Sequence, residues 1–360
     1  MVFGFKLTLL SMILIIGLVY MSQVEVQQCK PWNPEKEFWI LSLSGGGYRG
    51  LFSAEILKAL ERVSGCPLAN KFDLIAGTSV GSILASAIAK ELPASKLPSL
   101  FTKHGEDIFA CRKLLGGLVK SPGLFASRYR ADALKKLLSR EDLLSSCTFD
   151  ELNHRLIIPT VNLSQGRPQF FKTQHHPRYT QDGGRKVIDA VLASSAAPIF
   201  FPIYKFENNR YADGGLIANS PLLAAIHEAV YILGVPPENI NAISVGTMGG
   251  YLTIDPKMTL DAGLRQWGVN LVLMQMTAQE AMQDFMAGHV VKSRVINLDK
   301  RQSKEQASRV NLDSVDHNAQ EVLQGNATTV VQEKLSDDDS LFRKWKKHRA
   351  ERPVFFNQEH

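Results

Sequence analysis

Cysteine is scarce in this 360-residue chain, and the four cysteines stand far apart. Cys29, Cys66, Cys111 and Cys147 form no C-x-x-C pair, and none keeps metal-ligand spacing with a histidine. This distribution argues against a disulfide-stapled scaffold and against a metal site. Scattered thiols are typical of a reduced compartment, so we expect a cytoplasmic protein that needs no metal ion.

The sequence also lacks internal repeats, low-complexity tracts and any interdomain linker between residues 38 and 300. With 45% hydrophobic residues, the chain is long enough to bury one large core. Strand-like apolar runs alternate with helical ones, which predicts an α/β fold whose mostly parallel sheet is covered by helices on both faces. We further predict a strand pair at 156–163 and 169–173, and a helical insertion or lid at 90–150 with a helix at 131–138.

A serine between two glycines, Ser79 of Gly77-Thr78-Ser79-Val80-Gly81, follows the apolar run at residues 72–76. This pattern predicts a sharp turn from a strand into a helix, with small residues on either side of the turn. Such a turn exposes the serine hydroxyl as a nucleophile at the sheet edge. A tight turn needs glycines even without catalysis, so the motif alone leaves a structural role open.

A glycine-rich loop, Gly45-Gly46-Gly47-Tyr48-Arg49-Gly50, joins an apolar strand at 38–44 to an amphipathic helix at 51–63. Backbone N–H groups at such a helix start are free to bind an anion, here the oxyanion of an acyl-transfer intermediate. Arg49 adds positive charge at the same place. A dinucleotide-binding loop is the alternative interpretation. Such a loop requires an acidic residue at the carboxyl end of the next strand, where it binds the ribose. Asp73 lies at the near end instead.

A third segment, Asp213-Gly214-Gly215, is typical of a turn. With an exposed serine elsewhere, Asp213 becomes a candidate general base, because the serine needs a proton acceptor before it can attack. None of the nine histidines stands in a glycine-flanked loop. The sequence therefore favours a serine–aspartate dyad over a triad.

These three elements, in this order, resemble the patatin-like phospholipases over about residues 38–290. The resemblance implies a three-layer patatin-like fold, Ser79 as nucleophile and Asp213 as base. It also implies that Gly45, Gly46, Gly47, Arg49 and Gly50 form the oxyanion and phosphate side of the site. Segments 194–202, 219–221 and 243–247 are similar to further parts of the family pattern, although Met248 stands where a glycine commonly follows the threonine.

Residues 40–52 are similar to the bacterial patatin-like effectors of anti-phage (CBASS) signalling operons. That resemblance implies membrane phospholipid as substrate and a cyclic dinucleotide, cyclic GMP-AMP, as allosteric activator, with no cofactor and no nucleic acid polymer as partner. No sequence motif marks a cyclic-dinucleotide pocket. Two alternatives stay open: an unregulated or secreted patatin-like lipase, and a catalytically inactive module that binds lipid or nucleotide.

The N-terminal segment, residues 1–30, contains an apolar run at 7–21 behind Lys6. A membrane-spanning helix needs about 20 apolar residues, which the run reaches if residues 2–5 join it and Lys6 snorkels. The run is also compatible with a signal peptide, or with a reading frame whose true start is Met21. We expect an enzyme that acts at, or is anchored to, the inner membrane.

A net charge of +6 and a pI near 9.0 suit a protein that visits an anionic surface. The polar, basic extension at 291–360 carries a cluster of basic residues at 343–349. This cluster is either a solvated terminal helix or an electrostatic dock for anionic lipid, with Trp345 at the interface.

Overall fold

The computed structural model describes residues 32–114, 119–120, 123, 126–250, 259–335 and 339–356. The predicted N-terminal hydrophobic segment lies outside these residues. Among the helices that are described, none combines the length and the apolar character that a bilayer crossing requires.

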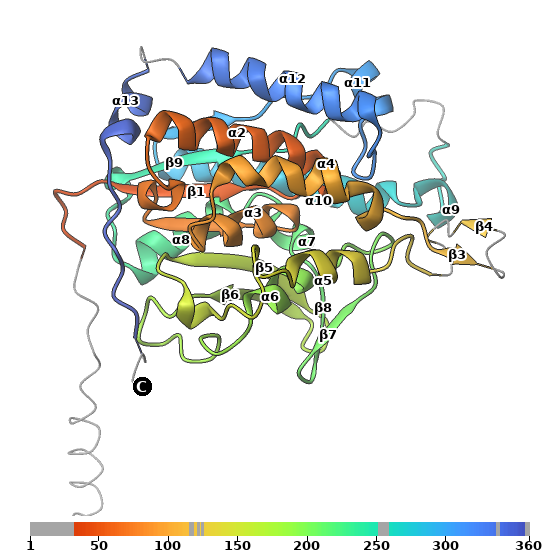
Figure 1. Cartoon of the computed structure of the whole chain (residues 1–360), viewed down its shortest axis with the longest axis horizontal. Helices are drawn as coiled ribbons and strands as arrows, with labels where there is room; N and C mark the ends of the chain where they lie inside the picture. The colour runs from red at the N-terminus through yellow and green to blue at the C-terminus, as the bar shows by residue number, and fades with distance from the viewer. Residues whose placement is uncertain are drawn as a thin grey trace, which may run out of the picture.

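The described strands form an eight-stranded sheet in the order β10-β9-β1-β2-β5-β8-β7, with β6 paired to β5 (Figure 1). Strands β10, β9, β1, β2 and β5 are mutually parallel, whereas β6, β8 and β7 run antiparallel to their neighbours. Their bounds are β1 Phe38–Leu43, β2 Leu74–Gly77, β5 Leu156–Asn162, β6 Arg167–Lys172, β7 Tyr204–Phe206, β8 Asn209–Asp213, β9 Ile240–Val245 and β10 Val295–Leu298. The predicted mostly parallel sheet and the predicted hairpin are both confirmed.

Strand β5 brings two distant segments together. Strand β6 pairs along one edge of β5 from Ile157 to Asn162, so β2 and β8 must share the other edge. There β2 pairs with the start of β5, and β8 pairs antiparallel with its end, placing Asp213 opposite Thr160. The carboxyl ends of β2 and β8 therefore meet, because one strand runs parallel to β5 and the other runs against it.

Helices cover both faces of the sheet, as the apolar runs predict. The larger core packs one face against α2 (Gly50–Ser64), α3 (Val80–Ala89), α6 (Val187–Ser194) and α12 (His317–Lys334). The smaller core packs the other face against α8 (Leu222–His227) and α10 (Asn270–Val290). Alternate residues of β1 divide between the two cores: Trp39 and Leu41 enter the larger, Phe38 and Ile40 the smaller. This is the three-layer arrangement that the sequence predicts.

The predicted insertion at 90–150 contains α4 (Leu97–Ile108) and α5 (Asp132–Leu138). It also contains an antiparallel pair of two-residue strands that the sequence analysis did not foresee, β3 (Lys113–Leu114) and β4 (Val119–Lys120). Helix α4 packs on α2 and α5. The insertion therefore stands beside the amino-terminal end of α2, where the glycine-rich loop lies.

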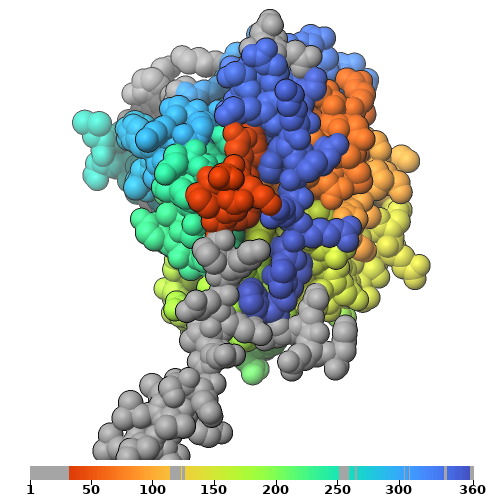
Figure 2. Space-filling view, turned by 90° about the vertical axis from the view of Figure 1, so that its left-hand side faces the viewer, coloured from red at the N-terminus to blue at the C-terminus, as the bar shows by residue number. Residues whose placement is uncertain are grey.

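The predicted boundary at residue 290 does not coincide with a break in packing. Strand β10 pairs in parallel with β9, and α12 lies along α2. After α11 (Lys304–Arg309) and α12, the short helix α13 (Ser340–Lys347) completes the larger core with Phe342 and Trp345. Figure 2 shows this carboxyl-terminal chain, in dark blue, running down one side of the molecule.

Trp345 does not stand at an interface with lipid. Its side chain is fully buried against Phe72, and the ammonium of buried Lys71 lies over its ring. The Lys71 ammonium also donates to the main-chain carbonyls of Lys346 and His348. The tryptophan therefore anchors the carboxyl-terminal chain, and the expected lipid contact through Trp345 is wrong because its indole is already part of the core.

Candidate active site

Ser79 occupies the sharp turn between β2 and α3. Its backbone lies at φ 53° and ψ −126°, a left-handed conformation that is strained for a residue with a side chain. The glycines on either side are required by close packing: a Cβ on Gly77 would collide with Gly81, and one on Gly81 with the carbonyl of Leu43. The turn thus lifts the serine above the sheet while α3 packs tightly beneath it.

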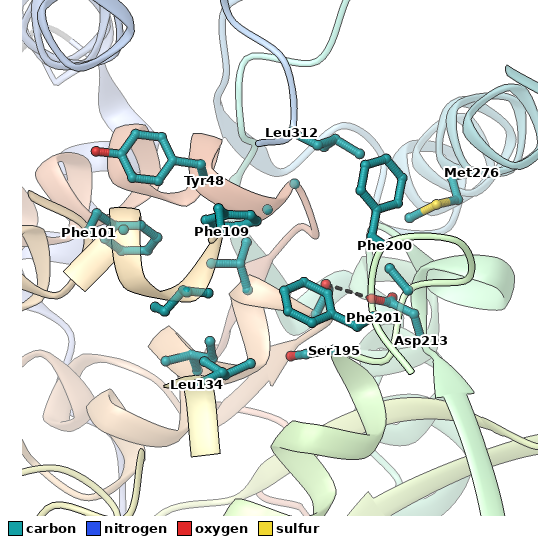
Figure 3. Close-up of a pocket in the computed structure, with 18 of the residues that line it drawn as sticks. Tyr48, Phe101, Phe109, Leu134, Ser195, Phe200, Phe201, Asp213, Met276 and Leu312 are labelled. Atoms are coloured by element: carbon teal, nitrogen blue, oxygen red, sulfur yellow. Dashed lines mark hydrogen bonds between the residues drawn. The ribbon is translucent and has the colours of Figure 1, made fainter. Parts of the chain in front are cut away.

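Asp213, the last residue of β8, faces this serine. The Ser79 hydroxyl donates to Asp213 Oδ2 at 2.8 Å (dashed in Figure 3). The Gly215 amide donates to Oδ1 at 2.6 Å. Gly214 lies so close to the carbonyl of Pro159 that no side chain would fit there. The structure therefore brings together the two residues that the sequence nominates as nucleophile and base.

Burial raises the pKa of Asp213 to about 7, although the hydrogen bonds from Gly215 and Ser79 act to lower it. Among the described residues no cation balances this carboxylate, and its side chain has no solvent exposure. A carboxylate with a pKa near neutrality accepts a proton far more readily than an ordinary aspartate. The environment of Asp213 is that of a general base.

Ser194, at the end of α6, connects Ser79 to strand β5 and to Gly214, the residue after Asp213. Its hydroxyl accepts the amide proton of Ser79 at 3.0 Å and donates to the carbonyl of Pro159 at 2.6 Å. Its own carbonyl accepts from the Gly214 amide at 3.2 Å. This fully buried serine holds the Ser79 turn and the end of β8 in register, and its sequence signal was only its place in segment 194–202, which is similar to the family pattern.

Three of the five residues predicted for the oxyanion site already use their amides. Gly45 donates to the carbonyl of Asn219, Arg49 donates to that of Gly46, and Gly50 closes the short turn of residues 47–49. Within the described part of the chain, the amides of Gly46 and Gly47 have no acceptor. The geometry therefore narrows the oxyanion donors to these two amides.

The Arg49 side chain turns back under the loop. Its guanidinium donates to the carbonyls of Gly46 at 3.4 Å and Met248 at 3.5 Å. Burial lowers its pKa, and the nearby carboxylates Glu280 and Asp299 act to raise it. Burial in turn raises the pKa of Glu280 to about 7 and also that of Asp299. In this structure Arg49 holds the loop and balances buried acids.

Asn219 connects Glu280 to the glycine-rich loop. Its side-chain amide donates to Glu280 at 2.7 Å, and its main-chain carbonyl accepts from the Gly45 amide. Its position in an Asn-Ser-Pro segment was a sequence signal for this link, because that segment resembles the family pattern. Glu280, in α10, carried no such signal.

An apolar pocket opens above the dyad, with a cavity volume of about 80 Å³. Its wall comes from the insertion, from the segment before β7, from α10 and from the chain beyond α11. The principal wall residues are Phe101, Phe109, Leu134, Phe200, Phe201, Met276 and Leu312 (Figure 3). An apolar pocket of this kind suits a fatty acyl chain. The predicted lid is thus one wall of the pocket, but sequence reasoning missed Leu312.

Histidine takes no part in the pocket as described, since none of its lining residues is a histidine. His175 is instead buried against Glu228, and His348 contacts Asp73. Among the described residues, no group of three or more histidine, cysteine, aspartate or glutamate side chains is arranged to hold a metal ion. The chemistry available at this site is that of a serine and an aspartate.

The chain is similar to curated phospholipases along most of its length. It is 36% identical over 323 residues to the cGAMP-activated phospholipase of Pseudomonas aeruginosa, covering 89% of this chain and 95% of that protein. It is 34% identical to the Vibrio cholerae enzyme of the same description, covering 84% and 92%. A cUMP-AMP-activated phospholipase of Escherichia coli is 30% identical over 58% of this chain and 63% of its own.

The patatin-like phospholipase family model matches residues 41–226. This range begins within β1, contains the glycine-rich loop, Ser79 and Asp213, and ends within α8. The match and the relatives agree with the geometry of the site, and the chain belongs to the patatin-like phospholipase family.

Proposed function

We propose that this protein is a phospholipase that releases fatty acids from membrane phospholipids with the Ser79–Asp213 dyad. The observation that carries the proposal is the 2.8 Å hydrogen bond from the Ser79 hydroxyl to a buried, uncompensated carboxylate beneath an apolar pocket. An acyl ester placed in that pocket would have its carbonyl between the nucleophile and the amides of Gly46 and Gly47.

In the first half of the reaction, Asp213 takes the hydroxyl proton as Ser79 Oγ attacks the ester carbonyl. The amides of Gly46 and Gly47 stabilise the oxyanion, a contribution of roughly 3–4 kcal/mol for a well-placed donor. Asp213 then gives its proton to the leaving alcohol, which departs as a lysophospholipid. In the second half, Asp213 takes a proton from water, the hydroxide attacks the acyl-serine, and Asp213 returns that proton to Ser79 Oγ as the fatty acid leaves.

A cyclic dinucleotide activator is part of the proposal, with cyclic GMP-AMP as the first candidate. It is supported by three relatives that match this chain over most of their length, all named as cGAMP-activated. The cUMP-AMP-activated relative makes cyclic UMP-AMP the comparison nucleotide. Such an enzyme acts at the cytoplasmic face of the inner membrane in anti-phage defence.

The test is fatty-acid release from phosphatidylethanolamine–phosphatidylglycerol vesicles by the full chain, without nucleotide, with cyclic GMP-AMP and with cyclic UMP-AMP. We expect release only with cyclic GMP-AMP and none from Ser79→Ala. The control is Ser86→Ala, which removes a buried hydroxyl from helix α3, directly after the Ser79 turn, without touching the dyad. Equal release without nucleotide would indicate an unregulated lipase. Full activity of Ser79→Ala would overturn the dyad itself.

A further inference from the structure

We propose that residues 310–316, called here the strap, close the lipid pocket, and that Asp313 fastens them to Tyr129 across its mouth. The strap connects α11 to α12 and is therefore more than 200 residues away in sequence from the nucleophile. The inference rests on the proposed phospholipase function, because it concerns how a lipid reaches Ser79.

One side of the strap is fixed to the glycine-rich loop. The Tyr48 amide, next to the two proposed oxyanion donors, donates to the carbonyl of Leu312 at 2.7 Å. Gly47 has φ +59°, and any side chain there would collide with the same carbonyl. The Leu312 side chain reaches into the pocket near Phe200 (Figure 3). The strap thus lies directly against the catalytic loop.

The other side of the strap is fixed to the insertion. Asp313 Oδ2 accepts from the Tyr129 hydroxyl at 2.5 Å and from Arg128 at 3.4 Å. The Tyr129 ring packs on Phe109 and Phe201, with centroids 5.4 and 5.6 Å away, and both phenylalanines line the pocket. Asp313 therefore joins the strap to the opposite wall.

These contacts close a ring around the pocket that runs from the loop through the strap to the insertion. The strap and the insertion therefore cover the pocket above Ser79 from two sides, and a phospholipid chain has to pass between them to reach the nucleophile. Water reaches this ring at Asp313, whose side chain is 21% exposed.

The flanking helices can stay in place when the strap moves. Ser303 caps the start of α11 with its side chain, and Asp316 caps the start of α12. Val310, the first residue of the strap, and Ala319, three residues beyond its end, are both buried. Because both helices are anchored independently, release of Asp313 frees only the short irregular segment between them.

The experiment compares two substrates on the full chain without nucleotide: phosphatidylglycerol vesicles and the small soluble ester p-nitrophenyl acetate. Asp313→Ala and Tyr129→Phe should each bring vesicle hydrolysis to at least five times the background that the parent protein shows without nucleotide, while changing ester hydrolysis less than twofold. Tyr204→Phe is the matched control, since it removes a tyrosine–aspartate hydrogen bond of the same 2.5 Å length, to Asp189, away from the strap. We expect it to change neither rate.

An unchanged or lower vesicle rate in both strap variants would overturn the proposal. Failure of the proposed function looks different, because Ser79→Ala would then retain activity on both substrates. A second measurement covers a variant that folds poorly: hydrogen exchange at the Tyr48 amide. Exchange should be slow in the parent protein and faster in Tyr129→Phe, which keeps the aromatic packing. Equal protection in the two proteins would show that Tyr129 does not hold the strap and would also overturn the proposal.

Discussion

The pKa values of two buried carboxylates in this protein, Asp213 and Glu228, are shifted in opposite directions. Asp213 has hydrogen-bond donors but no cation in the part of the chain that the structure describes, and burial raises its pKa to about 7. Burial would also raise the pKa of Glu228, but hydrogen bonds and charge from His175 and Lys172 lower it to about 2. Glu228 accepts from Lys172 at 2.6 Å, from Tyr179 at 2.5 Å and contacts His175 at 3.0 Å.

The comparison shows that partners, more than depth of burial, decide what a buried acid does. Glu228 is permanently charged and ties β6 to the chain after α8, which is a structural task. Asp213 is left without a counter-ion and can exchange a proton near neutral pH, which is a catalytic task. The four predictions that follow test this division of roles.

The largest effect should come from Asp213→Asn, which keeps the shape of the side chain but removes the base. We expect hydrolysis to fall roughly 10²–10⁴-fold, the usual contribution of a general base. The folded-state pKa of Asp213 is raised, so its stability contribution is present at low pH and lost as pH rises through about 7. Asp213→Asn should therefore raise the melting temperature most at pH 8 and by a smaller amount at pH 5, because the loss begins above the ordinary aspartate pKa of 3.8 and is complete above about 7. A lower melting temperature at pH 8 would contradict the assignment of an uncompensated charge.

Glu228→Gln should do the reverse, damaging the fold and sparing the chemistry. It leaves Lys172 facing an amide in a buried setting, and breaking such a pair typically costs about 3–5 kcal/mol. Urea denaturation measures the loss, and activity per folded molecule should stay unchanged. Glu207→Gln is the control, because its pair with Arg185 is half-exposed and should contribute less than about 1 kcal/mol. A loss of turnover in correctly folded Glu228→Gln would contradict the purely structural role of Glu228.

Ser194→Ala should slow the reaction without removing any catalytic group. It leaves the Ser79 amide and the Pro159 carbonyl without their partner, a penalty of about 1–3 kcal/mol for a buried polar group. We expect kcat to fall about tenfold with KM unchanged, because the displaced atom is the nucleophile. Ser86→Ala, on α3, serves as the control. An effect on KM alone would assign Ser194 to substrate binding instead of positioning.

The smallest of the four effects at physiological pH should be that of pH itself on the activity of the unmodified protein. Asp213 must be unprotonated to act, so kcat/KM for a soluble ester should rise with pH, reach half its maximum near pH 7 and level off above it. Glu228 stays ionised throughout this range and adds no second step. A plateau that extends unchanged down to pH 5 would show that the base is an ordinary, solvated carboxylate.

Much of the fold and of the dyad could be predicted from local patterns. The turn at Ser79 can be predicted from its flanking glycines, because the steric demands of a sharp turn act between neighbouring residues. The hairpin of β5 and β6 and the helix after Gly50 are likewise set by short-range alternation and helical spacing. Trp345 was misplaced because a basic, amphipathic helix looks the same whether its aromatic face meets lipid or the protein core.

The sequence by itself determined the residue types that the chemistry needs, the order of the strands that present them, and the membership of the family. Only the tertiary structure decided that the amides of Gly46 and Gly47 are the free ones, that Asp213 lacks a cation, and that Leu312 reaches the pocket. The reason is physical: acidity, hydrogen-bond saturation and cavity shape depend on all the groups within a few ångströms. In this protein those groups come from segments that lie as much as 200 residues or more apart in the sequence.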